Sequence, residues 1–257
     1  MDAHQNSHNA SSDTSWMNGL RALAVVGVVI HHWFLFVPFG GTDQIIGSLA
    51  GLVRDVGGTA LHLFFLLSGC GLTISRLRQE DFRLGKWARR RFEKIVLPYW
   101  AVIICTFCLA NLVLYSTGNS EKGYSWGSLL SYLTFASNHY QTAWEMNPTL
   151  WFMPVIVGLY IFFPFLVKVL KKYGAMVLLI FTGVVTYGSI VIFRFFDYDI
   201  EHMTAVFLFF VLEFAMGMVL GYLTVIHPRE LPPHAWGKGF HFGSRPLRFL
   251  LPDDQAF

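Results

Sequence analysis

Six runs of apolar residues, each close to 20 residues long, constrain this chain more than any other feature of its sequence. A helix needs about 20 apolar residues to cross the hydrocarbon core of a bilayer, whereas a membrane β-barrel needs short strands of alternating hydropathy. The sequence therefore predicts an all-α, polytopic integral membrane protein. Within the last run, Gly217 and Gly221 form a G-x-x-x-G spacing, which predicts close packing on another helix. The predicted membrane helices cover residues 20–38, 57–75, 95–115, 149–167, 176–194 and 204–226.

The balance of residue types agrees with this fold class and narrows the function classes. Hydrophobic residues make up 54% of the 257 residues and charged residues only 14%, which is unusual for a soluble domain. The net charge of +3 follows from basic loops at membrane ends, so we expect no nucleic-acid partner. The three cysteines suggest no disulfide framework, and no carboxylate or cysteine lies at ligand spacing from His31 or His32, so we expect no metal site.

The connector of residues 75–94 determines the expected topology. It reads "SRLRQEDFRLGKWARRRFEK" and carries eight basic residues against three acidic ones. Because basic loops near membrane ends stay in the cytoplasm, we expect this connector and both termini there. The expected domains are a disordered N-terminus over 1–17, a transmembrane domain over 18–226 and an irregular cytoplasmic tail over 227–257. Residues 125–148 would then lie outside, along the membrane surface.

The first run, "NGLRALAVVGVVIHHWFLF", carries ionisable side chains inside an otherwise apolar helix. Arg21 lies at its cytoplasmic mouth, and His32, eleven residues later, lies about 16 Å deeper. An ionisable group at that depth is costly, so it is a functional hypothesis by default. The alternative is a neutral histidine that is hydrogen-bonded between helices. His31 points about 100° away from His32, and we expect it to be structural.

A second basic cluster stands at the entry of the third run, in "ARRRFEKIVLPYW". Arg91 and Lys94 are three residues apart, so on an α-helix they share one face. One interpretation is a membrane-end signal that also binds anionic lipid headgroups. The other is a clamp for the phosphates of a cytoplasmic cofactor, which requires fixed cations.

These motifs, with three others, resemble the membrane-bound acyltransferase family 3, whose members mostly O-acylate sugars and envelope polymers. "NGLRALAVVGVVIHH" is similar to the family's first-helix pattern of a basic residue, ten others and a histidine, which selects Arg21 and His32. "LFFLLSG", residues 63–69, resembles the family's LSG signature, and "RRFEKIVLPYW" resembles its Arg-x-x-Arg entry into the third helix. "LWFMPVIVGLYIFFP" and "LEFAMGMVLGYL" resemble later helices.

The resemblance implies a reaction and assigns roles to residues. The donor would be acyl-coenzyme A, used as a co-substrate on the cytoplasmic side, with no permanently bound cofactor. Arg91 and Lys94, supported by Arg90 and Arg21, would contact this donor. His32 would be the catalytic histidine. It would either remove the proton of the acceptor hydroxyl or carry the acyl group itself.

The chain departs from the family pattern in three respects. Lys94 stands where arginine is preferred, which keeps the charge but loses the bidentate fork. Phe152 and Ile156 fall near places where many members carry a serine and a glutamate, which bears on the substrate class rather than on activity. Members also carry more membrane helices, so the chain resembles a C-terminally shortened member of the family.

Three further side chains are candidates for binding the acceptor. His62 and Glu213 lie within predicted membrane helices, where lipid exposure is costly. Each could face the same internal cavity as His32. Glu213 could there orient a histidine or bind an acceptor hydroxyl, and its alternative is a structural polar contact between helices. Trp151 lies at the predicted outer surface, where the alternatives are an aromatic belt and a platform on which sugars stack.

The sequence thus predicts a membrane acyltransferase that moves an acyl group, expected to be acetyl, from acyl-coenzyme A to a hydroxyl of a carbohydrate or cell-envelope acceptor. Its expected location is the plasma membrane, the inner membrane of a bacterium. Its expected partners are acyl-coenzyme A, that acceptor and the lipid bilayer, and self-association into a homo-oligomer stays open. The alternatives are a truncated, catalytically inactive homologue that serves as a membrane scaffold or partner subunit, and a transporter-like module.

Overall fold

The computed structural model describes residues 15–36, 44–79, 83–119, 122–137, 146–196 and 206–226, and the regular structure in these ranges is helical. This confirms the all-α fold class. The segment 1–17, expected to be disordered, lies outside the described residues except at its end, where α1 (Ser15–Phe36) already begins. The expected tail, 227–257, lies outside them altogether.

Four stretches of the described chain are long and apolar enough to cross a membrane: Thr59–Leu77, Leu84–Ser116, Thr149–Phe195 and Phe207–Ile226. The third stretch holds two predicted runs, so the four together cover most of five of the six. The remaining run corresponds to α1, which is not among the four. The membrane class is confirmed, and the expected count of six helices is approximate.

The chain divides into two compact units. Unit 1 is built from α1, α2 (Gln44–Leu77) and, from Leu212 on, α8 (Val211–Ile226), together with residues 172–179. Unit 2 is built from α3 (Leu84–Arg91), α4 (Leu97–Ser116), α5 (Trp126–Leu133), most of α6 (Phe152–Phe195) and the 3₁₀ turn Phe207–Phe210. Each unit holds its own group of candidate residues.

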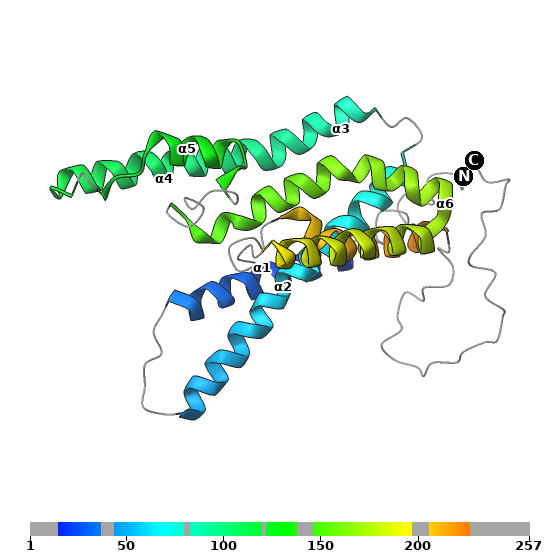
Figure 1. The fold of residues 1–257 in the computed structure, drawn as a ribbon, viewed down its shortest axis with the longest axis horizontal. Coiled ribbons are helices and arrows are strands. Elements are labelled where there is room, and N and C mark those ends of the chain that lie inside the picture. The colour runs from blue at the N-terminus through cyan, green and yellow to red at the C-terminus, as the bar shows by residue number, and fades with distance from the viewer. Residues whose placement is uncertain are drawn as a thin grey trace, which may run out of the picture. The chain divides into compact units, whose positions relative to one another are not determined.

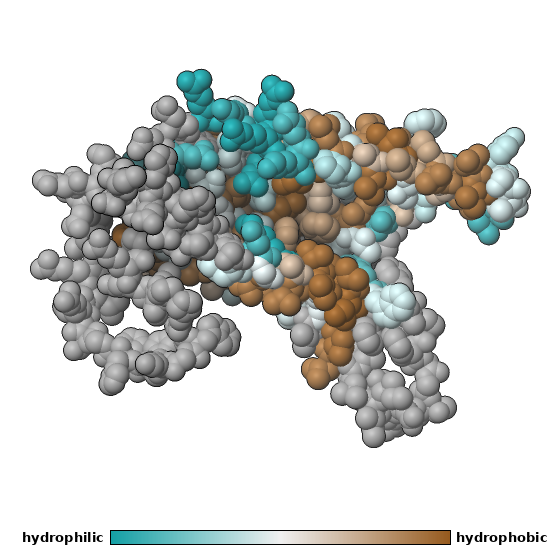
Figure 2. Space-filling model, turned by 180° about the vertical axis from the view of Figure 1, so that it is seen from behind, coloured by the Kyte–Doolittle hydropathy of each residue, from teal (hydrophilic) through white to brown (hydrophobic). Residues whose placement is uncertain are grey.

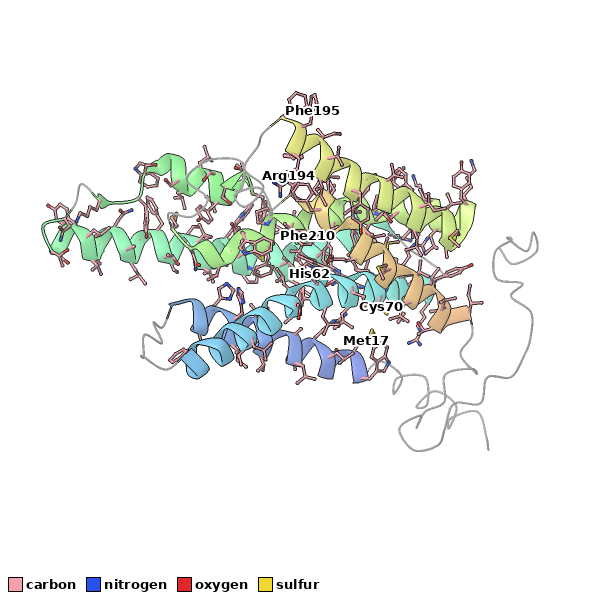
Figure 3. The ribbon with its side chains drawn as sticks, turned by 60° about the horizontal axis from the view of Figure 1, so that its bottom comes forward. Met17, His62, Cys70, Arg194, Phe195 and Phe210 are labelled. Atoms are coloured by element: carbon pink, nitrogen blue, oxygen red, sulfur yellow. The ribbon has the colours of Figure 1, made fainter. Side chains whose placement is uncertain are left out.

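In unit 1, α1 and α2 run antiparallel and approach each other closely. At one end, a Cβ built on Gly57 of α2 would lie only 2.9 Å from the Cβ of His31 in α1. At the other end, Met17 and Cys70 are buried together with their sulfur atoms 3.8 Å apart, and Figure 3 labels both residues there. His31 therefore lies against the backbone of α2.

The second helix contact of unit 1 joins α2 and α8, which run parallel. A Cβ built on Gly217 would overlap the carbonyl group of Leu66, and one built on Gly221 would lie 2.5 Å from the carbonyl oxygen of Cys70. Both matches join residues 151 positions apart, so the two helices advance together in one register. The G-x-x-x-G spacing thus marks a close helix contact, as the sequence predicts.

In unit 2, α3 continues into α4 through a π-helical turn, Phe92–Val96. The Leu97 N–H donates to the carbonyl of Phe92, five residues earlier, instead of four as in an α-helix. Single π-helical turns of this kind are found frequently at functional sites. Figure 2 shows hydrophilic side chains gathered over α3, whereas the surface of α4 is mainly hydrophobic.

The helix α5 lies alongside α4 and antiparallel to it (Figure 1). The hydroxyl of Tyr99 donates to the carbonyl of Tyr132 at 3.0 Å, and the indole N–H of Trp100 donates to that of Leu133, also at 3.0 Å. Carbonyls at the end of a helix lack partners within the helix, so these two donors satisfy them. Farther along α4, the side chain of Asn111 binds the backbone just before α5.

The helix α6 turns back on itself at Gly174, as Figure 1 shows. Gly174 has a φ of 83°, which a residue with a side chain adopts at a cost. The two halves then pack together, with the rings of Phe165 and Phe181 5.8 Å apart. The predicted runs 149–167 and 176–194 are therefore separate arms of one hairpin.

Candidate active site

His32 lies in α1, where its ring nitrogen Nδ1 is 2.8 Å from the carbonyl oxygen of Val28, one turn earlier. Because a carbonyl oxygen only accepts, this contact assigns the proton of the neutral ring to Nδ1 and the lone pair to Nε2. The side chain is partly buried, and its ring meets that of His31 edge-on with 5.3 Å between the centroids. His32 thus has a defined basic nitrogen, as both catalytic interpretations require.

Arg21 is held against α2. Its Nη2 donates to the carbonyl of Leu67 at 3.3 Å, and its Nη1 donates to the side chain of Asn18 at 3.5 Å. The space for the guanidinium exists because residue 71 is glycine, since a Cβ at Gly71 would overlap it. Sequence reasoning missed this role of Gly71, although the glycine stands two residues after the end of the LSG signature.

The structure brings together His62 and Glu213, which are 151 residues apart in the chain. Nδ1 of His62 lies 2.8 Å from Oε1 of Glu213, and the side chains are 52% and 31% exposed. The second carboxylate oxygen, Oε2, is buried and has no hydrogen-bond partner among the described residues. Figure 3 labels His62 on α2, between the two ends of that helix. The sequence indicated each residue separately but not that they form a pair.

In unit 2, the guanidinium carbon of Arg91 lies 5.5 Å from the centre of the Tyr160 ring in α6, within the range of a cation–π interaction. Trp87, one turn earlier in α3, packs on the rings of Tyr160 and Phe163 with centroid distances of 6.5 Å and 5.7 Å. Arg91 is therefore a partly buried cation whose position is fixed by aromatic contacts.

The other cations of this cluster are exposed. Arg90 and Lys94 face the surface, and Arg89 forms an ion pair with Glu93 at 2.7 Å. The expectation that Arg91 and Lys94 share one face assumed a regular α-helix. The π-helical turn begins directly after Arg91. Because a π-helix has more residues per turn than an α-helix, Lys94 lies farther from the face of Arg91 than regular α-helical spacing would place it. Arg91 and Lys94 thus differ in burial and in direction.

Trp151 ends a 3₁₀ turn, Pro148–Trp151, which the side chain of Asn147 caps by accepting the N–H of Thr149 at 3.0 Å. Its ring lies 5.9 Å from that of Phe210, centroid to centroid, and the side chain is partly buried. Trp151 is therefore held in place by a second aromatic ring from the same unit.

The candidate residues fall into one group in each unit. Unit 1 holds Arg21, His32, His62 and Glu213, and unit 2 holds Arg90, Arg91, Lys94 and Trp151. Within the part of the chain that the structure describes, no three His, Cys, Asp or Glu side chains lie together as a metal ion would require. The candidate residues themselves offer histidine, carboxylate, indole and cationic side chains.

A family model described as an acyltransferase domain, that of the acyltransferase 3 family, matches residues 14–241. The chain belongs to the acyltransferase 3 family. The match includes every described helix and every candidate residue named above. Long apolar helices assign this acyltransferase 3 chain to a membrane.

The acyltransferase 3 chain is also similar to a characterised relative, acyltransferase MdmB from Streptomyces mycarofaciens. The two are 27% identical over 166 residues, which cover 61% of this chain and 40% of the relative. The aligned part therefore spans less than half of that relative's length. No solved structure matches the chain.

Proposed function

We propose that this chain moves an acyl group from acyl-coenzyme A to a hydroxyl group of a carbohydrate or cell-envelope acceptor, and that the acyl group is acetyl. The observation that carries the proposal is the family match over residues 14–241, which includes the Arg21 and His32 motif. The proposed location is the inner membrane of a bacterium, with both termini in the cytoplasm. The basic residues around α3, at a predicted membrane end, support this orientation.

In this proposal, arginine and lysine side chains bind the acyl-coenzyme A donor. Arg91 is suited to the phosphates of coenzyme A because its guanidinium is already fixed on Tyr160, so little conformational freedom is lost on binding. Arg90 and Lys94 add exposed positive charge, and Arg21, held at the carbonyl of Leu67, supplies a further fixed cation.

The chemical step falls to His32. A hydroxyl is a weak nucleophile at neutral pH, and a histidine either removes its proton as it attacks or first takes the acyl group itself. Both routes use Nε2, the nitrogen that carries the lone pair when Nδ1 donates to Val28. On the acceptor side, the ring of Trp151 would stack on a sugar, and His62 and Glu213 would bind hydroxyl groups.

The test is acyl transfer from labelled acetyl-coenzyme A by membranes that carry the full chain. Label is expected in the envelope fraction with the wild type, and His32→Ala is expected to lower the transfer by about 100-fold or more. Arg91→Ala is expected to raise the KM for acetyl-coenzyme A. Absence of transfer by a well-folded wild type would overturn the proposal.

Each variant has a matched control in the same helix. His31→Ala removes the adjacent ring but keeps the Cβ that lies against Gly57, so transfer is expected to stay at the wild-type level. Arg89→Ala removes an exposed cation whose partner is Glu93, and the KM for acetyl-coenzyme A is expected to change little. Equal losses in His31→Ala and His32→Ala would contradict the assignment of His32.

A further inference from the structure

Two of the histidines of unit 1, His32 and His62, have partners of different charge. Nδ1 of His32 is bonded to a neutral backbone carbonyl, and Nδ1 of His62 is bonded to a carboxylate, at 2.8 Å in both cases. Either partner orients the ring and leaves the lone pair of the neutral imidazole on Nε2. A carboxylate does more, because it also stabilises the imidazolium that forms when the ring takes up a proton. His62 is thus the better proton acceptor of the two.

The surroundings of Glu213 support this role. It lies in the first turn of α8, where the helix dipole stabilises a negative charge. Its buried Oε2 has no hydrogen-bond partner among the described residues, so the carboxylate depends strongly on the proton that His62 can share with it. The side chain of His62 is 52% exposed, which leaves its ring accessible to a ligand.

The helix contacts hold this pair in place. Gly217 lies against Leu66 one turn beyond Glu213 and His62, and Gly221 lies against Cys70 one turn farther. The backbones of α2 and α8 are therefore in contact next to the pair. A side chain that is held on a rigid element in this way is suited to catalysis rather than to adaptable binding.

The position of His62 along the axis of the α1 and α2 pair is close to that of His32. Along antiparallel α1 and α2, Arg21 is matched with Leu67, and His31 is matched with Gly57. By this register, His62 stands opposite the part of α1 between Arg21 and His32, about six residues or 9 Å along the axis from the level of His32. The two histidines thus lie within about two helical turns of each other along the axis.

We propose that His62 and Glu213 form a second catalytic pair, in which His62 takes the proton of the acceptor hydroxyl, Glu213 positions and stabilises it, and His32 acts on the donor. The inference rests on the proposed acyltransferase function and deepens it. It also decides between the two roles open to His32. His32 carries the acyl group, because the proton acceptor stands elsewhere.

The steps balance as follows. Nε2 of His32 attacks the thioester carbonyl carbon, a C–N bond forms, the C–S bond breaks, and coenzyme A leaves as a thiolate. The hydroxyl oxygen of the acceptor then attacks the same carbon, a C–O bond forms, the C–N bond breaks, and His32 regains its lone pair. The hydroxyl proton passes to Nε2 of His62 and finally neutralises the thiolate through solvent.

The experiment separates the two half-reactions in membranes that carry the full chain. With labelled acetyl-coenzyme A as the probe, it measures hydroxylamine-sensitive label on the protein and label in the envelope fraction. His62→Gln and Glu213→Gln are expected to lower transfer to the envelope by about 100-fold or more while label on the protein persists. His32→Ala is expected to lose both signals. Glu213→Asp keeps the carboxylate and is expected to restore transfer in part.

Two outcomes would overturn the inference. One is wild-type transfer by His62→Gln, and the other is loss of protein-bound label in His62→Gln together with transfer, which would make the residue structural. Thermal unfolding in detergent identifies a variant that has lost its fold, and Glu213→Asp then gives the decisive comparison. If the wild type transfers and depends on His32 but not on His62, this inference fails alone. If the wild type transfers nothing, the proposed function fails as well.

Discussion

Gly217 in α8 lies so close to Leu66 in α2 that a Cβ at position 217 would overlap the Leu66 carbonyl group. Because the obstacle is backbone, it cannot move aside as the end of a side chain can. We expect Gly217→Val to push the helices apart and to lower the free energy of unfolding by about 1–3 kcal/mol. The measurement is chemical unfolding of the detergent-solubilised chain.

The control for this prediction is Gly188→Ala in α6. A Cβ at Gly188 meets nothing within 4 Å, so the substitution is expected to be neutral or to stabilise the helix by about 0.5–1 kcal/mol. Equal destabilisation by both substitutions would contradict the close contact between α2 and α8.

A substitution at Gly71, unlike one at Gly217, is expected to have little effect on stability. The atoms that a Cβ would meet at Gly71 belong to the flexible end of the Arg21 side chain. We expect Gly71→Ala to leave the unfolding midpoint nearly unchanged but to move the guanidinium away from the carbonyl of Leu67. If Arg21 supports donor binding, the KM for acetyl-coenzyme A rises several-fold. Gly85→Ala, where a Cβ meets nothing within 4 Å, is the control. An unchanged KM in Gly71→Ala would contradict a role of Arg21 in donor binding.

The hydrogen bond from Tyr99 is expected to stabilise the contact between α4 and α5. Its hydroxyl donates to the carbonyl of Tyr132, which also accepts the N–H of Phe135. Tyr99→Phe therefore removes one bond without leaving the carbonyl unpaired, and we expect a loss of about 0.5–1.5 kcal/mol in the free energy of unfolding. Tyr115→Phe changes a 77% exposed ring in the same helix and is expected to have no effect. A loss of the same size in both variants would show that the bond contributes nothing specific.

The aromatic ring of Tyr160 is expected to position Arg91 for binding acetyl-coenzyme A. Tyr160→Phe keeps an aromatic face under the guanidinium, whereas Tyr160→Leu removes it. A cation–π interaction at a partly exposed site contributes about 0.5–1 kcal/mol, so we expect Tyr160→Leu to raise the KM for acetyl-coenzyme A about two- to five-fold. Tyr160→Phe is expected to match the wild type. If both variants raise the KM equally, the phenolic hydroxyl and not the ring face is what matters.

Much of this fold could be predicted from the sequence because the determining signals are local. A run of about 20 apolar residues is sufficient to indicate a membrane helix, and the G-x-x-x-G spacing of Gly217 and Gly221 indicates a close contact. The Arg21 and His32 motif lies within one helix, so its spacing alone places both residues. The hairpin at Gly174 follows the predicted separation of two runs, 149–167 and 176–194.

The features that the sequence did not predict depend on distant contacts. Nothing local shows that His62 and Glu213 form a pair, because the pairing requires the register of α2 against α8. The position of α5 along α4 depends on two aromatic donors, Tyr99 and Trp100, whose residue types alone suggest a membrane interface. The π-helical turn after Arg91 is a small backbone change that no residue type in the segment specifies.

The matched positions of α2 and α8 advance by four residues at each step, whereas an α-helix completes a turn in about 3.6 residues. Such a row winds about 40° round each helix per step, so two helices matched along it must cross at an angle. Glycine stands where the backbones touch, at Gly217 and Gly221, and two longer side chains, His62 and Glu213, bridge the helices one step away. The hydrogen-bonded pair of His62 and Glu213 thus lies one helical step from these backbone contacts, so a substitution at Gly217 that changes how α2 and α8 cross also changes the geometry of the pair.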